Sequence, residues 1–154
     1  MADGLCEVLM PGVATTVQDL PGRGGYAAFG VPAGGAWDDL ALSLANLAVG
    51  NPPGAAGLEG MLRGPVLRFR RPSTICVAGA ASEPTLDGLP VRTGVPVDVF
   101  TGQTLDLGPV RGAGLRVYLA VRGGLAVPTV LGSQSTYTPG HLGGFRGRVV
   151  RVGD

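Results

Sequence analysis

The residues with the clearest potential for chemistry lie between positions 15 and 23. This segment combines two hydroxyls, an amide, a carboxylate and a guanidinium, from Thr15, Thr16, Gln18, Asp19 and Arg23. The hydroxyls and the amide can orient a polar ligand, Asp19 can transfer a proton, and Arg23 can bind a carboxylate or phosphate through two parallel hydrogen bonds. Glycines and prolines follow up to position 36 and predict a long loop with one strand in it, the kind of segment in which binding residues concentrate. The alternative is structural: the threonines belong to the strand, and Asp19 and Arg23 close a turn.

A second group of polar residues follows in a predicted helix and just after it. Asp38 and Asn46 are eight positions apart, which places them on roughly one helical face. Asp38 is a candidate for proton transfer, and Asn46 and Glu59 are candidates for substrate binding. The alternative is that Asp38 caps the helix and that Asn51 serves a turn.

Two more candidate groups lie toward the C-terminal end of the sequence. Arg122 follows an apolar run and precedes a Gly-Gly turn, so its guanidinium is expected at the end of a strand, unless it is an ordinary solvated hairpin residue. Ser133, Ser135 and Thr136 precede a glycine-rich stretch at 143–147. Hydroxyls and freely oriented backbone N–H groups of this kind can form an anion-binding nest.

Several common chemistries have no support in the sequence. All twelve basic residues are arginines, so Schiff-base and P-loop lysines are excluded. The glycines at 22–25 do not have the spacing of a dinucleotide-binding loop, and no Gly-x-Ser-x-Gly nucleophile elbow occurs. His141 is the single histidine, which leaves a Ser-His-Asp triad without support. Cys6 and Cys76 are not in a metal-ligand spacing and are expected to be reduced thiols, so no metal site is predicted.

The composition predicts a turn-rich β protein. Of 154 residues, 28 are glycine and 13 are proline, and a hydrophobic fraction of 45% is enough for a globular core. A net charge of +1 gives no electrostatic reason to expect a nucleic-acid partner. No apolar run is long enough to span a bilayer and no signal-peptide pattern occurs, so we expect a cytoplasmic protein with no membrane partner.

The elements that must position these residues are mostly short strands. Residues 38–49 form the principal predicted helix, with Asp38-Asp39 at its start and Gly50 at its end. Strands are predicted at 5–10, 65–69, 74–78, 97–100, 104–107, 115–121 and 149–152, with a hairpin turn at Asp87-Gly88. One helix among many strands favours a mainly β barrel or sandwich, formed by a single domain over 1–154. The turn-like ending Gly153-Asp154 indicates an incomplete part of a longer chain.

Five ordered segments resemble one family: PGVATTVQDLPGRGGY, GVPAGGAWDDLALSLANLAVGN, GLEGMLRGPVLRF, YLAVRGGLAVPTVLGSQSTY and GGFRGRVVRVGD. They are similar to the biotin-dependent carboxyltransferases, also called allophanate hydrolase subunit 2. The chain departs from the family pattern where Pro21 precedes Gly22-Arg23 and where Met61 replaces a usual threonine, and His141 is not part of that pattern.

The resemblance implies a cyclophilin-like β-barrel and the N-terminal part of a carboxyltransferase region, subdomain A and B. It also implies one component of an ATP-dependent 5-oxoprolinase-type hydrolase that opens a small cyclic amide. Its expected partners are the other two components of such an enzyme, the B component, which resembles allophanate hydrolase subunit 1, and the A component. ATP would act at the level of the complex, and the lysine-free chain has no biotin attachment site.

For a hydrolase of this type, the expected catalytic residues are Asp19, Arg23, Asp38 and Arg122. Arg122 and the 133–136 stretch are expected beside the 15–23 segment. Two alternatives stay open: carboxyl transfer from carboxybiotin to urea or a similar amide, and non-enzymatic antagonism of a kinase inhibitor.

Overall fold

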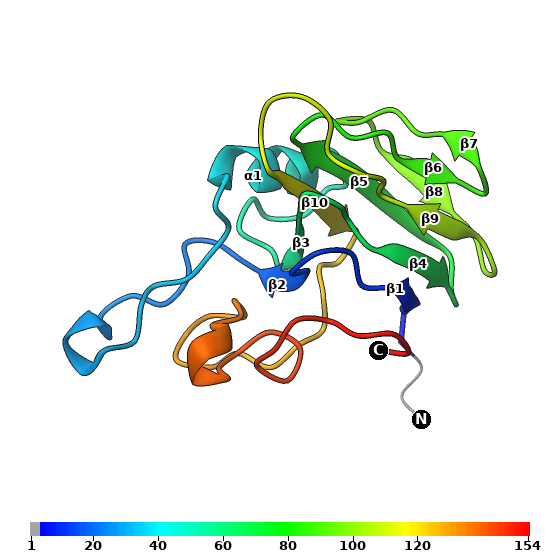
Figure 1. Cartoon of the computed structure of the whole chain (residues 1–154). Helices are drawn as coiled ribbons and strands as arrows, with labels where there is room; N and C mark the ends of the chain where they lie inside the picture. The colour runs from blue at the N-terminus through cyan, green and yellow to red at the C-terminus, as the bar shows by residue number, and fades with distance from the viewer. Residues whose placement is uncertain (1–3) are drawn as a thin grey trace.

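The computed structural model describes residues 4–154 and has two five-stranded antiparallel sheets with one α-helix (Figure 1). The first, called the β1 sheet, has the order β1 (Cys6–Met10), β4 (Val66–Phe69), β9 (Thr104–Asp106), β6 (Thr85–Leu86) and β7 (Leu89–Pro90). The second, called the β2 sheet, has the order β2 (Thr16–Gln18), β3 (Gly57–Met61), β10 (Arg116–Val121), β5 (Ser73–Gly79) and β8 (Val97–Val99). Short 3-10 helices span Ala27–Phe29 and Thr138–Gly140. The predicted mainly β class with one principal helix is therefore confirmed.

The main core lies between the two sheets. Leu67 and Phe69 of β4 and Leu105 of β9 are buried in one cluster with side chains of the β2 sheet. The β2 sheet contributes alternate residues, such as Val117 and Leu119 of β10, as the two-residue period of a strand requires. The residues between them therefore point to the other face of the β2 sheet, away from this core.

Helix α1 (Asp39–Ala48) covers part of that outer face. Ala45 and Val49 pack against Cys76 of β5 and Ala120 of β10 in a second, small cluster. Small side chains allow the helix to approach the sheet closely. Leucines 40, 44 and 47 recur at helical spacing but do not face the sheet, because they are 64%, 55% and 56% exposed.

Local signals fix both ends of the helix. The Asp38 carboxylate accepts a hydrogen bond from the backbone N–H of Ala41 at 2.9 Å, which is the N-cap interaction expected of an aspartate. After Val49 the chain turns at Gly50, with φ of +80°, a conformation that glycine adopts without strain. The predicted helix at 38–49 is thus confirmed to within one residue at each end.

We expect Asp38→Ala to lower the free energy of unfolding by about 1 kcal/mol, because the Ala41 N–H loses its cap. Asp38→Asn keeps a capping oxygen and should restore most of this stability. Urea unfolding followed by circular dichroism measures both. Equal losses in the two variants would contradict the capping role. Activity lost in Asp38→Asn at unchanged stability would instead support a proton-transfer role for Asp38.

Most predicted strands form within a residue or two of their expected bounds, and Asp87-Gly88 connects β6 to β7 as a hairpin turn. Strand β3 was not predicted. The strand expected at 149–152 is wrong: residues 149–151 are irregular and a turn begins at Val152. Backbone hydrogen bonds still attach this tail: Val150 N–H donates to the Thr15 carbonyl, Gly153 N–H to the Val8 carbonyl and Val8 N–H to the Asp154 carbonyl, each at 2.9 Å.

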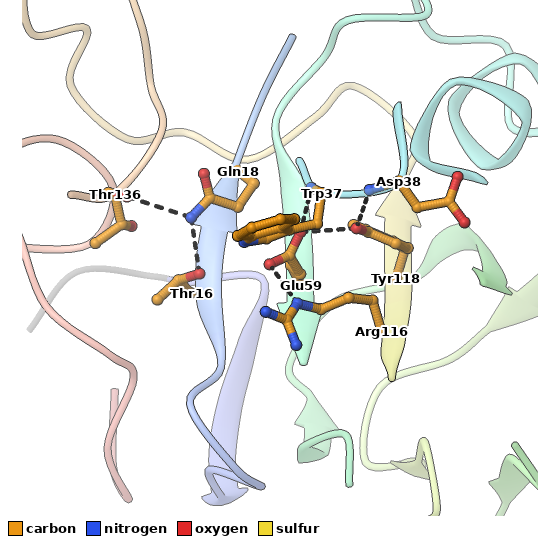
Figure 2. Close-up of polar contacts among 8 residues, drawn as sticks. All are labelled: Thr16, Gln18, Trp37, Asp38, Glu59, Arg116, Tyr118 and Thr136. Carbon is orange, nitrogen blue, oxygen red and sulfur yellow. Dashed lines mark hydrogen bonds and ion pairs between the residues drawn. The ribbon is translucent and has the colours of Figure 1, made fainter. Parts of the chain in front are cut away.

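Within residues 4–154 no helix is long and apolar enough to cross a membrane. Figure 1 also shows the segment between β2 and α1 running out from the sheets as a long arm before it returns to the start of the helix. The return places Trp37 and Asp38 over the part of the β2 sheet that α1 leaves uncovered (Figure 2).

Candidate functional site

A set of polar side chains shares the outer face of the β2 sheet beside the helix. In the strand register, Thr16 of β2 lies opposite Glu59 of β3, and Glu59 lies opposite Tyr118 of β10. Gln18, two residues after Thr16 on β2, and Arg116, two residues before Tyr118 on β10, point to the same face of the sheet. We call the whole set the polar row: Thr16, Gln18, Glu59, Arg116 and Tyr118. Figure 2 shows these side chains next to one another, with the Trp37 ring among them.

Glu59 is the centre of the polar row. Its Oε2 accepts hydrogen bonds from the Tyr118 hydroxyl at 2.7 Å and from the Trp37 backbone N–H at 2.9 Å. Its Oε1 accepts from Arg116 Nε at 3.2 Å, which also forms an ion pair. Glu59 is only 6% exposed, so these partners compensate for the cost of burying its carboxylate.

Tyr118 connects the sheet to the start of the helix. It is fully buried, and its hydroxyl accepts a hydrogen bond from Asp38 N–H at 2.8 Å while it donates to Glu59. Burial raises the pKa of Tyr118 well above its usual range, and the neighbouring carboxylates of Glu59 and Asp38 raise it further, although the hydrogen bond from the Asp38 backbone lowers it. Tyr118 is therefore a hydrogen-bond donor at neutral pH.

The raised pKa of Tyr118 makes stability depend on alkaline pH. Above about pH 10 the unfolded chain loses the phenolic proton while the folded chain keeps it, so stability falls as pH rises. We expect Tyr118→Phe to make the free energy of unfolding less dependent on pH, by up to about 1.4 kcal/mol per pH unit. Urea unfolding at a series of pH values between about 8 and 11 measures it. Tyr26→Phe is the matched control for loss of one phenol, and equal slopes in the two variants would refute the assignment.

Arg116 and Trp37 stack at the solvent side of the polar row. The guanidinium carbon lies 5.6 Å from the centroid of the indole ring, within the range of a cation–π contact. The Arg116 side chain is 22% exposed, whereas Trp37 is 79% exposed. The ring is thus a large apolar group presented to solvent directly over a charged one.

Gln18 forms the other end of the polar row. Its amide nitrogen donates to Thr16 Oγ1 at 2.9 Å and to the Thr136 carbonyl at 3.3 Å. Its amide oxygen is buried and has no hydrogen-bond partner among residues 4–154. A buried acceptor without a donor is costly, so this oxygen stands out as an unused hydrogen-bond acceptor of the polar row.

Asp19 lies just beyond this end and connects two loops. Its carboxylate accepts hydrogen bonds from Ser133 Oγ at 2.7 Å, from Gln134 N–H at 2.6 Å and from Ser135 Oγ. The expected proximity of the 133–136 stretch to the 15–23 segment is therefore confirmed. Ser133 and Ser135 are 1% and 0% exposed and already bonded, so their visible role is to hold Asp19. Their direct contact with substrate stays a prediction.

Arg23 is buried behind the same loops. It is 2% exposed, its Nη2 donates to the Ser135 carbonyl, and its Nε and Nη1 have no partner among the described residues. Gly143 has φ of +62°, and a Cβ there would collide with Arg23 Nη2. The glycine thus makes room for the guanidinium.

Three predicted site residues do not join the polar row. Arg122 lies past the opposite end of β10 from Arg116 and donates from Nε to the Val49 carbonyl at 3.2 Å, and its expected catalytic role beside the 15–23 segment stays a prediction. Asn46 is fully buried and donates to the Ala55 carbonyl at 2.8 Å, while Asn51 donates to its Oδ1 at 3.0 Å. Thr15 is 1% exposed, and its hydroxyl has no partner within residues 4–154.

The sequence did not indicate three residues that the structure places at the site: Trp37, Arg116 and Tyr118. Arg116 and Tyr118 are two positions apart in a strand that is otherwise apolar. That alternation marks one face of a strand, and it is the signal that could have identified them.

Comparisons with known proteins place this geometry in a family. The family described as carboxyltransferase domain, subdomain A and B, matches residues 29–154. The urea amidolyase of Saccharomyces cerevisiae is 43% identical over 96% of this chain, which covers 8% of that protein. The C component of the 5-oxoprolinase of Escherichia coli is 39% identical over 97% of this chain and 48% of its own length.

Solved structures agree with these relatives. The crystal structure of the urea amidolyase of K. lactis superimposes with a TM-score of 0.95 and 41% identity, over 100% of this chain and 9% of the larger one. This chain thus spans less than half of each curated relative named here. By sequence and by fold, it belongs to the carboxyltransferase domain, subdomain A and B, family.

Proposed function

We propose that this chain is part of one component of an ATP-dependent 5-oxoprolinase-type enzyme, which opens a small cyclic amide to an amino acid. The observation that supports it best is the similarity to the 5-oxoprolinase C component over 97% of this chain. In the reaction, water adds to the amide carbonyl carbon and the carbon–nitrogen bond breaks, with ATP hydrolysis driving the step. The companion B and A components would complete the enzyme.

The polar row fits the binding of an amide. The unpaired amide oxygen of Gln18 can accept the N–H of the substrate, with Thr16 holding the Gln18 amide in place. Asp19 and its hydroxyl partners would position this end of the row, because the Thr136 carbonyl that anchors Gln18 directly follows Ser135. Arg23 and Asp38 remain candidates for charge neutralisation and proton transfer.

ATP would act at the level of the complex, and we propose that the companion components, rather than this chain, bind it. The sequence has no lysine and no Gly-Lys-Ser/Thr phosphate loop. The one guanidinium with unpaired buried nitrogens among the described residues, that of Arg23, is only 2% exposed. These residues do not fit a nucleotide site.

The second candidate is carboxyl transfer to urea or a similar amide. Its support is the 43% identity to urea amidolyase and the TM-score of 0.95 with the solved urea amidolyase. Both reactions act on a carbonyl flanked by nitrogen, so the same row could bind either substrate.

Co-expression of the full-length protein with its companion components tests the two candidates. Hydrolysis of ATP that depends on 5-oxoproline supports the first. Carboxylation of urea by carboxybiotin, with no response to 5-oxoproline, supports the second. Activity with neither substrate would refute both and leave the non-enzymatic alternative.

A further inference from the structure

The two terminal amino groups of Arg116 make no hydrogen bond to the rest of the described chain. Only its Nε is used, in the hydrogen bond to Glu59 Oε1 at 3.2 Å. Neither terminal amino group has a hydrogen-bond partner among residues 4–154. By contrast, Arg148 directs both terminal groups to Asp154, at 2.6 and 2.9 Å. Arg116 therefore presents two unused donors in the fixed fork that matches a carboxylate.

The side chain of Arg116 is also held in place before any ligand binds. Glu59 holds the Nε side, and the Trp37 ring stacks on the guanidinium at 5.6 Å. Trp37 is itself anchored, because its backbone N–H donates to Glu59 Oε2 at 2.9 Å. A fixed fork loses less side-chain entropy on binding than a free arginine does.

We propose that Arg116 and Trp37 form the subsite that binds the carboxylate of the substrate. The two terminal amino groups of Arg116 would donate parallel hydrogen bonds to the carboxylate. The exposed indole of Trp37 would cover the apolar edge of the substrate's lactam ring. Glu59 does not compete for these donors, because its Oε2 is occupied by Tyr118 and Trp37 and its Oε1 by Nε.

This subsite rests on the proposed function, and it narrows the class of substrate that the enzyme would accept. It favours a cyclic amide that carries a carboxylate, such as 5-oxoproline, over a neutral amide. Urea has no anionic group and would leave both amino groups of Arg116 unused. The same residues therefore give a physical basis for distinguishing the two candidate reactions.

The test compares 5-oxoproline with 2-pyrrolidinone, the same lactam without the carboxylate, in the full-length protein with its companion components. Arg116→Lys keeps the ion pair with Glu59 but loses the fork. We expect it to raise KM for 5-oxoproline about 10- to 100-fold and to change kcat less than about 3-fold, since two charge-assisted hydrogen bonds are weakened. Turnover of 2-pyrrolidinone should not change. Arg111→Lys, at a side chain that is 69% exposed and pairs with Glu83 outside the polar row, is the matched control.

A second variant, Trp37→Leu, keeps the subsite testable if Arg116→Lys does not fold. Trp37→Leu alters a side chain that is 79% exposed and should fold normally. Its KM for 5-oxoproline should rise about 2- to 5-fold through loss of the cation–π contact. Equal effects of Arg116→Lys on both lactams, or no effect of either variant on 5-oxoproline, would overturn the subsite.

Direct binding separates failure of the subsite from failure of the proposed function. If the complex hydrolyses no lactam, the proposed function fails, and calorimetry with the same two compounds still tests the subsite. Weaker binding of 5-oxoproline alone in Arg116→Lys supports it. Absence of 5-oxoproline binding to the wild-type complex overturns it.

Discussion

Glu59→Ala is expected to lower the free energy of unfolding by about 3 kcal/mol and to remove most of the amide-dependent activity. The substitution deprives Arg116 of its ion pair and Tyr118 of its acceptor, and it releases the backbone of Trp37. Removing one partner of a buried ion pair costs about 3–5 kcal/mol, and the lower end applies because Arg116 is 22% exposed and regains some hydration. Urea unfolding followed by circular dichroism measures the change.

Two companion variants make this result specific. Glu59→Gln keeps Oε1 as an acceptor but can place an N–H₂ against two donors, so it should cost roughly 1–2 kcal/mol. Glu83→Ala removes a carboxylate that is 73% exposed and pairs with Arg111 at 3.5 Å, and it should change stability by less than about 0.5 kcal/mol. Similar losses for Glu59→Ala and Glu83→Ala would show that Glu59 does not organise the site.

Sequence features were sufficient for the elements that local signals define. Asp38 and Gly50 mark the two ends of the helix through an N-cap and a left-handed residue. Asp87-Gly88 marks a hairpin because both residues adopt positive φ, +51° and +79°. In each case the decisive interaction lies within a few residues of sequence.

Strand β3 could not be predicted, because its sequence is set by tertiary contacts. Gly57 is unfavourable in a strand, yet a Cβ there would lie 2.8 Å from the Leu119 carbonyl and 2.9 Å from the Leu42 side chain. The glycine is required for close approach of the helix and β10. Glu59 on the same strand looks unsuited to a buried position until Arg116 and Tyr118 are placed beside it.

The site could be predicted only in part, because tertiary contacts also bring its residues together. Thr16, Gln18 and Glu59 were identified from their side-chain chemistry, and the register places them on one face. Arg116 and Tyr118 were hidden in a strand that is buried on both faces, by the core and by the arm before α1. Their place in the polar row depends on pairing with β3, which the sequence did not reveal.

Asp19→Ala is expected to be the other strongly destabilising change, by about 3–5 kcal/mol. It removes the acceptor of three hydrogen bonds to a buried carboxylate, each worth roughly 1.5 kcal/mol or more. Because Ser133 is 114 positions away in sequence, the loss weakens the attachment between two segments that only tertiary contacts hold together. Chemical unfolding measures it, and Asp39→Asn, at an exposed acid in the first turn of α1, is the control.

A double-mutant cycle with Ser133→Ala tests whether the hydrogen bond itself is responsible. The two changes should be non-additive by about 1–2 kcal/mol, because each removes the same contact. Additive losses would mean that Asp19 and Ser133 stabilise the loops independently.

Asp19→Asn then separates a positioning role from a catalytic one. An amide keeps one acceptor oxygen but points a donor at the Gln134 N–H or at a hydroxyl, so a positioning role predicts a clear loss of stability with partial activity. Activity should fall mainly through KM, because the anchor of Gln18 on the Thr136 carbonyl moves with this loop. A proton-transfer role predicts the opposite pattern, in which kcat collapses while stability is nearly unchanged. We expect the first pattern, because every hydrogen bond that the structure gives to the Asp19 carboxylate comes from the loop that it holds.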